Sequence, residues 1–367
     1  MNKWNYVSET KKSSGYDEYM DYLKSCTHDK YVSLSDEEKD KLIDDIFNVY
    51  RSKNIFPITY FNDEGIKEEI QKCIDKHVEF NDGTLDLKYN QGSALGKFMF
   101  PNLFKVQCKN DKNNSMIERF NNDHKLKRAI KLSLDIKANV TPSNIFGALQ
   151  LIGGSTASGF KCMTAKALYE KYVPKGGIIH DNCAGFGNRM LGALSSKNNY
   201  TYIATEVNSD TVESLNRLGG YIEQVTGREN SFKIIKQGSE DFKLSKPYFD
   251  FSFTSLPYFT LERYSDEETQ SVVKFPELDS WLEGYIRPTF ENTYFMLKPN
   301  CRYAINIADF NVGKTRVEFV DECIKIAKEV GFEYETTIAM KIQSRTGVGN
   351  ADNSIRKQEG VYLFKKV

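Results

Sequence analysis

The spacing of hydrophobic residues predicts helices in the first part of the chain. Over residues 35–50, apolar side chains recur on one helical face, and Ser35 with Glu38 three positions later forms a capping signature at the start. A second, acid-rich helix is predicted over residues 62–76. We therefore expect residues 1–150 to form a mostly helical N-terminal region, a candidate for DNA or substrate recognition.

From about residue 160 the pattern changes, and short apolar runs alternate with amphipathic helices. Strands are predicted at 177–180, 200–205, 232–235, 249–254, 302–307, 333–342 and 360–365. Helices are predicted at 164–172, 209–226, 281–297 and 316–330, and a glycine-rich turn followed by a helix is predicted at 182–194. This alternation is typical of a doubly wound sheet. The seven strands predict a Rossmann-like α/β domain over residues 151–367.

A glycine-punctuated stretch and a basic segment lie between these two patterns. Residues 90–104 are interrupted by glycines, which predicts a loop or a short strand. Residues 97–137 carry ten Lys or Arg against four Asp or Glu, whereas the whole chain balances 50 basic with 50 acidic residues. The neutral total gives no general signature of nucleic-acid binding. The local excess fits either a phosphate-contacting face or the solvated side of an amphipathic helix.

Cysteine and histidine usage does not indicate a metal centre. The seven cysteines are scattered without a CxxC pair, and the four histidines are dispersed along the chain. This distribution predicts reduced thiols and no metal site. The N-terminus lacks the apolar core of a signal peptide, and no apolar run reaches membrane-spanning length. We expect a cytoplasmic protein with no membrane partner.

The first candidate for chemistry is the glycine-rich turn after the predicted strand 177–180. Asp181 directly follows this strand, and Gly185 and Gly187 precede a predicted helix. Glycines at the carboxyl end of a parallel strand let the backbone approach a ligand closely. A single GxG is common in strand–turn–helix units, so this turn needs support from its neighbours.

Two acidic turns on the following strands supply that support. Glu206 ends the next strand about 20 residues later, where an acidic residue accepts hydrogen bonds from ribose hydroxyls. Ser239 and Glu240 follow the third strand and fit either the border of an adenine site or an acidic surface turn. A nicotinamide dinucleotide fold shows similar features, but Met190 stands at the last glycine position of its GxGxxG fingerprint. The nucleoside of S-adenosylmethionine fits better.

The fourth strand ends in Thr-Ser-Leu-Pro-Tyr-Phe, residues 254–259. This sequence resembles the (D/N/S)PP(Y/F/W) motif of methyltransferases that modify an exocyclic or amide NH₂ group. The resemblance implies that the Ser255 oxygen and a main-chain carbonyl accept hydrogen bonds from the amino group, while Tyr258 stacks on a planar substrate. Leu256 departs from the motif, which has a proline there, so it restores an N–H and loosens the backbone.

Together these motifs are similar to the amino-methyltransferase branch of the class I S-adenosylmethionine-dependent methyltransferases, over about residues 160–365. They look like the phage- and prophage-type DNA adenine-N6 or cytosine-N4 enzymes. The resemblance implies a seven-stranded methyltransferase sheet, no metal, and direct methyl transfer from S-adenosyl-L-methionine to a DNA base. The implied catalytic residues are Ser255, Pro257 and Tyr258. The implied cofactor-binding residues are Phe160, Thr164, Asp181, Ala184, Gly185, Gly187, Glu206, Ser239 and Glu240.

Other acceptors remain compatible with the same motifs. A base in duplex DNA must be flipped out of the stack, and Phe259, Arg263 and Tyr264 are either helpers in that step or parts of a surface loop that closes the pocket. The alternative acceptor is another amine or amide, such as an RNA base or a protein glutamine. A non-catalytic relative, with Leu256 as the sign of lost chemistry, is the third hypothesis. The target base, the recognition sequence and the oligomeric state stay open.

Overall fold

The chain divides into two units, each built from segments that are distant in the sequence. The computed structural model describes residues 16–53, 56–80, 84–86, 89–108, 114–136, 138–154, 156–341 and 360–367. The first unit contains Met1–Glu64 and Pro101–Ser158, and the second contains Gly65–Phe100 and Gly159–Val367. The predicted boundary near residue 150 lies close to the last crossing between units. The segment 65–100, however, belongs with the sheet-containing unit.

The first unit is helical in its described residues, as the hydrophobic spacing predicted. α3 (Asp36–Ser52) begins with the expected capping box, in which the Glu38 N–H donates to the Ser35 hydroxyl and the Ser35 N–H donates to the Glu38 carboxylate. Its buried face packs against α7 (Asp123–Asp135), which also contacts α8 (Pro142–Gly153). The other elements are α1 (Tyr16–Ser25), α2 (His28–Val32), η1 (Pro101–Lys105), β2 (Gln107–Cys108) and α6 (Met116–Asn121).

The second unit contains the doubly wound sheet, which confirms the predicted fold class. Its order is β1-β11-β12-β8-β6-β3-β4-β5. Neighbouring strands from β8 to β5 run parallel, whereas β12 is antiparallel to both β8 and β11. The strands are β1 (Thr84–Asp86), β3 (Ile178–Asp181), β4 (Thr201–Glu206), β5 (Phe232–Lys236), β6 (Phe249–Ser255), β8 (Leu297–Ile307), β11 (Phe332–Lys341) and β12 (Gly360–Lys366). All seven predicted strands are present, and β1 adds an eighth that pairs in parallel with β11.

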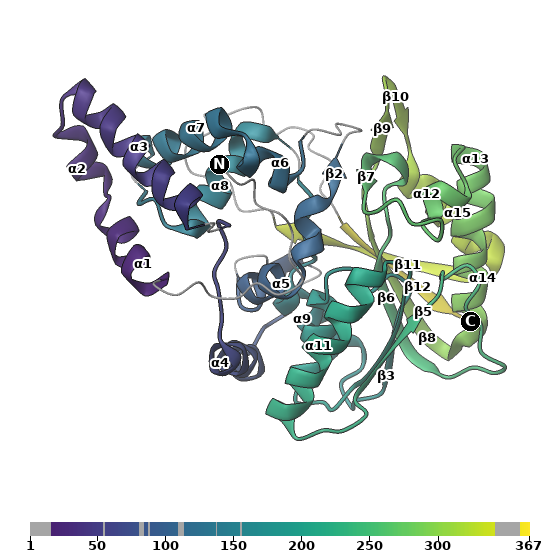
Figure 1. The fold of residues 1–367 in the computed structure, drawn as a ribbon. Coiled ribbons are helices and arrows are strands. Elements are labelled where there is room, and N and C mark those ends of the chain that lie inside the picture. The colour runs from purple at the N-terminus through teal and green to yellow at the C-terminus, as the bar shows by residue number, and fades with distance from the viewer. Residues whose placement is uncertain are drawn as a thin grey trace. The chain divides into compact units, whose positions relative to one another are not determined.

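Helices cover the sheet in two groups (Figure 1). α9 (Cys162–Tyr172), α10 (Asn188–Leu194) and α11 (Ser209–Thr226) pack on one another. α14 (Arg287–Met296) and α15 (Phe319–Val330) form the second group, on the other side of the strands from α11. The remaining elements of this unit are η2 (Phe259–Leu261), β7 (Glu262–Arg263), α12 (Ser271–Lys274), α13 (Leu278–Trp281), η3 (Leu282–Ile286), β9 (Phe310–Val312) and β10 (Thr315–Val317), and α4 (Asp63–Asp75) begins at the unit boundary.

The prediction of a loop or short strand at 90–104 is wrong. The stretch forms α5 (Ser93–Met99), followed by η1. Its glycines serve the helix instead of breaking it. Gly92 caps the start with a φ of 77°, and a Cβ on Gly96 would lie 2.4 Å from the Asn188 side-chain oxygen. The small residue therefore allows α5 to pack closely against the start of α10.

The helix predicted over 281–297 is present but contains a π-helical turn. Three consecutive elements, α13, η3 and α14, make up the helical run, and η3 is the π-helical part. Pro288 has no N–H to donate to the carbonyl of Gly284, which an α-helix would require. The Arg287 N–H bonds instead to the carbonyl of Leu282, five residues earlier.

Other predicted boundaries shift by a few residues. The helix predicted at 316–330 begins only at Phe319, because β9 and β10 form a hairpin before it. The glycine-rich turn and helix predicted over 182–194 are both present, and the helix occupies Asn188–Leu194. The last residue of the strand predicted at 333–342 lies outside the described residues. In the part of the chain that the structure describes, none of the helices has both the length and the hydrophobicity to cross a membrane.

Candidate functional site

The sheet brings the predicted motifs to one edge. β3 pairs in parallel with β4 on one side and with β6 on the other, and β4 pairs in parallel with β5. The chain proceeds from β3 to β4 and β5, and then crosses to β6 on the far side of β3. This reversal is the topological switch point at which open α/β sheets bind ligands. The turns after β3, β4, β5 and β6 therefore surround one candidate site.

The turn after β3, residues 181–187, is called the cofactor turn here. Gly185 and Gly187 adopt φ values of 55° and 70°, which disfavour any side chain. A Cβ on Gly187 would lie 2.5 Å from the Phe100 ring, so this position is also closed by packing. A Cβ on Gly185 would meet nothing closer than 3.7 Å. The backbone at Gly185 is thus open to a close approach by a ligand.

Asp181 holds the cofactor turn from inside. Its side chain is fully buried and forms an ion pair with Arg189, with 2.7 Å between Arg189 Nε and Asp181 Oδ2. The Tyr202 hydroxyl on β4 donates to the same carboxylate oxygen, and the Cys183 N–H donates to the other. Burial lowers the pKa of Arg189, but the charge and the hydrogen bond of Asp181, with smaller contributions from Tyr202 and Tyr169, together raise it overall. The bonds of Asp181 are made within the protein, so its contact with a cofactor stays a prediction.

Arg189 and Tyr202 were not predicted as site residues. Arg189 is the second residue of α10, and its side chain returns to the end of β3. Tyr202 lies on the neighbouring strand, and only the β3–β4 pairing brings its hydroxyl to Asp181. A signal for Arg189 exists in the sequence, since a basic residue inside an apolar helix segment next to a buried acid indicates a pair.

Glu206 joins the end of β4 to the cofactor turn. One carboxylate oxygen accepts the Gly185 N–H at 2.9 Å, and the other accepts the N–H groups of Val207 and Asn208, also at 2.9 Å. Burial raises the pKa of Glu206, whereas these three backbone donors lower it and limit the rise. The carboxylate lies at the glycine turn, as expected of an acceptor for ribose hydroxyls.

The turn after β5 is fixed by α14. The Asn292 side chain donates to the backbone carbonyls of Ser239 and Glu240. The Ser239 and Thr289 hydroxyls lie 2.8 Å apart. Glu240 is 8% exposed and pairs with Lys274 at 2.5 Å. The predicted residues Ser239 and Glu240 therefore lie in the turn after β5, and hydrogen bonds hold the backbone of this turn in place.

The remaining predicted cofactor residues lie near the same edge. The Ala184 N–H donates to the Thr205 carbonyl, which ties the cofactor turn to β4. The Phe160 ring packs edge-on against Phe253 of β6, with centroids 5.1 Å apart. The Thr164 hydroxyl, in the first turn of α9, is buried and has no hydrogen-bond partner among the described residues. A buried hydroxyl without a partner is costly, and a ligand polar group would relieve that cost.

Residues 255–258, called the acceptor loop here, leave the end of β6. Ser255 is partly exposed, and its hydroxyl donates to the Asn306 side-chain oxygen at 3.3 Å. Pro257 and Tyr258 are also partly exposed. The Tyr258 ring meets Phe310 and Phe319 edge-on, with centroids 6.2 and 6.5 Å apart. Aromatic contacts therefore fix the tilt of the predicted stacking ring.

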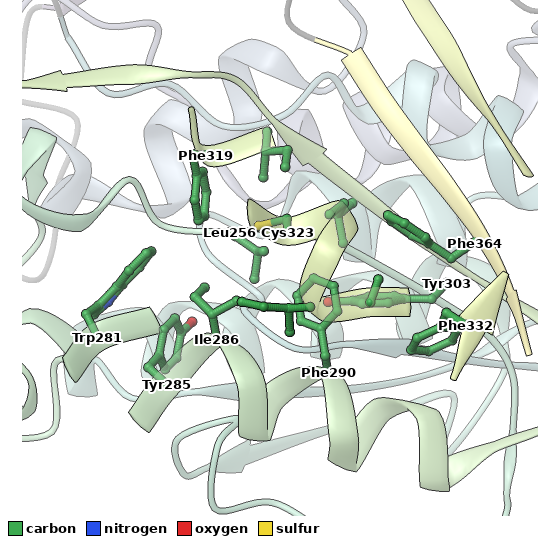
Figure 2. Packing of buried hydrophobic residues seen from close by; sticks show 14 of the residues in the cluster. Leu256, Trp281, Tyr285, Ile286, Phe290, Tyr303, Phe319, Cys323, Phe332 and Phe364 are labelled. Carbon is green, nitrogen blue, oxygen red and sulfur yellow. The ribbon is translucent and has the colours of Figure 1, made fainter. Parts of the chain in front are cut away.

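Leu256 is a core residue, which explains its departure from the motif. It is 1% exposed and belongs to the apolar cluster between the sheet and the second group of helices. Figure 2 shows it among Phe319, Cys323 and Ile286. Side-chain burial thus anchors the loop where the motif proline would stiffen its backbone. Phe259, expected as a helper in base flipping, is 4% exposed and packs on Trp281, so that expectation is wrong.

Residues 260–274, called the covering loop here, contact the turns that follow β3, β4 and β5. The Tyr264 ring lies 6.2 Å from that of Phe186 in the cofactor turn. Glu267 accepts the backbone N–H and hydroxyl of Ser209, after β4. Lys274 bonds Glu240 after β5. Of the other two expected helpers, Tyr264 bonds Glu262, and Arg263 pairs with Asp266, and neither contact decides between a role in base flipping and a loop that closes a pocket.

Tyr285 is a site residue that sequence reasoning missed. It lies on the π-helical η3, is 4% exposed, and places its hydroxyl 3.0 Å from the Cys183 sulfur in the cofactor turn. Burial raises the pKa of the Cys183 thiol to about 12, so the thiol is protonated near neutral pH. Pro288, which follows the π-turn, is the local signal that could have indicated an irregular helix here.

The residues present fit S-adenosylmethionine without a metal. The open backbone at Gly185, the carboxylate of Glu206 and the unpartnered Thr164 hydroxyl offer groups for the nucleoside and the amino-acid part of the cofactor. In the described ranges, no cluster of three or more His, Cys, Asp or Glu is arranged to hold a metal ion. All seven cysteines are free thiols.

Comparison with known proteins finds likeness only at the level of structure. No family model matches the chain, and no curated protein matches it in sequence. A TehB-like SAM-dependent methyltransferase from Corynebacterium glutamicum aligns with 57% of this chain and 90% of its own, at 18% identity and a TM-score of 0.34. TrmN from Thermus thermophilus aligns with 56% of this chain and 49% of its own, at 13% identity and a TM-score of 0.36.

A third solved structure contains the demethylated cofactor. The 1,6-didemethyltoxoflavin-N1-methyltransferase of Burkholderia thailandensis, solved with S-adenosylhomocysteine, aligns with 56% of this chain and 78% of its own, at 11% identity and a TM-score of 0.36. With TM-scores below 0.5, these likenesses do not decide the function. The function of this chain therefore has to follow from its own site.

Proposed function

We propose that this chain is an S-adenosylmethionine-dependent methyltransferase that methylates an exocyclic amino group of a DNA base, adenine N6 or cytosine N4. The observation that carries the proposal is the position of the cofactor turn and the acceptor loop. They follow β3 and β6, which are paired neighbours at the switch point of the sheet. A methyl donor over Gly185 and an amino group at Ser255 would therefore share one site.

The residues of this site support a direct displacement. The sulfonium of S-adenosylmethionine supplies an activated methyl group. The acceptor nitrogen forms the new N–C bond as the S–C bond breaks, the bonding electron pair remains on sulfur, and the nitrogen then loses a proton to solvent. The Ser255 oxygen accepts a hydrogen bond from the amino group and aims the nitrogen lone pair at the methyl carbon. Such positioning is a large part of the rate that an enzyme can supply.

Tyr258 supports a planar acceptor. Its ring is partly exposed and is held edge-on by Phe310 and Phe319, so one face can stack on a base. A base in a duplex would have to be extruded, which costs a few kcal/mol that stacking offsets in part. The Leu256 carbonyl is available to accept the second amino hydrogen, because replacing proline with leucine leaves the carbonyl unchanged.

A different amine or amide acceptor is the second candidate, and the use of the basic residues favours it. Lys127 pairs with Asp44 at 2.5 Å, Lys125 bonds Asn114, and Arg119 is 1% exposed. Several charges of the segment 97–137 are therefore paired with other groups of the same chain, in the case of Lys127 at the surface, which weakens the argument for a phosphate-contacting face. Lys109, Lys112 and Lys137 lie outside the described residues.

The test is methyl transfer from labelled S-adenosylmethionine to DNA, RNA and glutamine-containing peptides, followed by mass analysis of the nucleosides and peptides. We expect N6-methyladenine or N4-methylcytosine in DNA. Tyr258→Ala should abolish the transfer, whereas Tyr248→Ala, at an exposed tyrosine of the same unit, should leave it unchanged. Transfer to RNA or peptide alone would replace the acceptor. Cofactor binding without transfer to any acceptor would contradict the enzymatic proposal.

A further inference from the structure

Asn306 lies beside Ser255, in a strand that is otherwise apolar at this depth. It is 1% exposed on β8, and its neighbours Ile305 and Ile307 are fully buried. In the parallel pairing of β6 with β8, Ser255 and Asn306 are register partners. Burying a side-chain amide costs free energy unless its hydrogen bonds are made. Its partners therefore indicate why an amide stands here.

The orientation of the Asn306 amide is determined by a backbone carbonyl. Its nitrogen donates to the Gly360 carbonyl of β12 at 3.0 Å. Because a carbonyl only accepts, the NH₂ end of the amide must face Gly360 and the oxygen must face the other way. That oxygen lies 3.3 Å from the Ser255 hydroxyl. An amide oxygen also only accepts, so Ser255 is the donor of this hydrogen bond.

We infer that Asn306 is a positioning residue that makes the Ser255 oxygen a hydrogen-bond acceptor for the substrate amino group; this role rests on the function proposed above. A serine hydroxyl has one proton and two lone pairs. With the proton held toward Asn306, the lone pairs face away from the strand, where an NH₂ group needs an acceptor. The distance is long for a hydroxyl hydrogen bond, as is common before a substrate is present.

The same logic explains why serine needs this partner and other motif residues do not. An aspartate or asparagine in the first motif position carries an oxygen that can only accept. A serine hydroxyl can turn its proton toward the substrate and repel its NH₂ hydrogens. Asn306 removes that alternative, since the Gly360 carbonyl prevents the amide from rotating. Two successive hydrogen bonds, from Asn306 to the Gly360 carbonyl and from Ser255 to Asn306, thus fix the direction of the Ser255 hydroxyl proton.

The test is a double-mutant cycle with Asn306→Val and Ser255→Asn, measured on the acceptor identified for the wild type. In the Ser255 background, Asn306→Val should lower kcat by about tenfold, the value of one lost hydrogen bond to a reacting group. In the Ser255→Asn background, whose amide oxygen is an acceptor without help, the same change should lower kcat less than about twofold. The affinity for S-adenosylmethionine, measured by calorimetry, should not change in either background.

Each outcome decides a different claim. An equal loss of kcat in both backgrounds would show that Asn306 only supports the sheet, and would overturn the inference while the proposed function stands. Absence of wild-type transfer to every acceptor would overturn the proposed function and this role together. If Asn306→Val does not fold, Asn306→Ala in the same two backgrounds gives the same comparison.

Discussion

The cofactor turn and the acceptor loop follow neighbouring strands, yet they are held in place by different forces. In the cofactor turn, a buried ion pair and several polar bonds converge on Asp181 and Gly185. In the acceptor loop, Leu256 is fixed by apolar packing, and the Ser255 side chain has, among the described residues, one long hydrogen bond. The polar bonds of the cofactor turn hold its backbone in one orientation. Burial of Leu256 holds the acceptor loop against the core but leaves its backbone freer to adjust.

This difference fits the tasks proposed for the two regions. A cofactor of constant shape is best met by a preorganised turn, because the protein then loses little conformational entropy on binding. A planar acceptor has to enter and leave in each cycle, so a loop anchored at one side chain suits it. Four substitutions test this difference between the cofactor turn and the acceptor loop, each with its own measurement.

Removing Arg189 should have the largest effect. Arg189→Met leaves the Asp181 carboxylate buried without its cation, which costs about 3–5 kcal/mol of unfolding free energy and should abolish cofactor binding. Lys325→Met, at an exposed ion pair of the same unit, should cost about 0–1 kcal/mol. Urea unfolding gives the unfolding free energies of both variants, and hydrogen exchange in β3 and β6 shows where the stability is lost. A loss for Arg189→Met as small as that of the control would show that the ion pair does not fix the turn.

Truncating Leu256 should be next in size. Leu256→Ala opens a cavity in the cluster of Figure 2 and should cost about 2–5 kcal/mol of unfolding free energy. Val273→Ala, at a partly exposed position, should cost far less. Calorimetric titration should find S-adenosylmethionine affinity retained at a temperature where the variant is folded. Lost cofactor affinity in the folded variant would contradict the separation of the two regions.

Acidification should lower the unfolding free energy through protonation of His180, in the strand that precedes the cofactor turn. This residue of β3 is fully buried, and burial lowers its pKa from 6.5 to about 3. The unfolded chain then binds a proton that the folded chain does not, so stability is complete above pH 6.5 and is lost as pH falls toward 3. The loss should reach about 2 kcal/mol between pH 7 and pH 5. His180→Gln should remove this part of the pH dependence, and an unchanged slope would argue against a buried neutral imidazole.

Removing the Tyr285 hydroxyl should have the smallest effect. Tyr285→Phe deletes its contact with Cys183 and should weaken S-adenosylmethionine binding by about 0.5–1.5 kcal/mol, with packing kept. Tyr294→Phe, whose hydroxyl bonds an exposed backbone carbonyl, is the matched control and should leave the affinity unchanged. Equal affinities for the two variants would show that the π-helical turn does not support the cofactor side.

The parts that the sequence predicted well are those with local signals. Local sequence predicts the alternating strands and helices, the turn glycines and the acidic residue at the end of β4. Their meeting at one end of the sheet follows from the order of the parallel strands. The structure therefore confirms the sheet and brings Gly185, Glu206, Ser239 and Ser255 to one edge. Their contacts with a cofactor or substrate remain predictions.

The parts that the sequence did not predict depend on pairing between distant segments. Asn306 is 51 positions from Ser255, and only strand register makes them neighbours. Tyr285 and Cys183 are 102 positions apart, and only the packing of η3 against the cofactor turn makes them neighbours. The glycines near Gly96 indicated a loop, because a pattern cannot show that a missing side chain makes room for another helix. Leu256 looked like a lost motif residue until its burial showed a second way to anchor the loop.

The covering loop has a kinetic consequence. Its contacts with Ser209 and Glu240 bridge the turns after β4 and β5, between which a bound nucleoside would lie. Under the proposed function, a methyl donor bound there would enter, and its spent form would leave, while these contacts are broken. Because one of them is an ion pair, salt lowers the barrier to opening. Turnover should then be limited by release of the spent cofactor at low ionic strength and by the chemical step at high ionic strength.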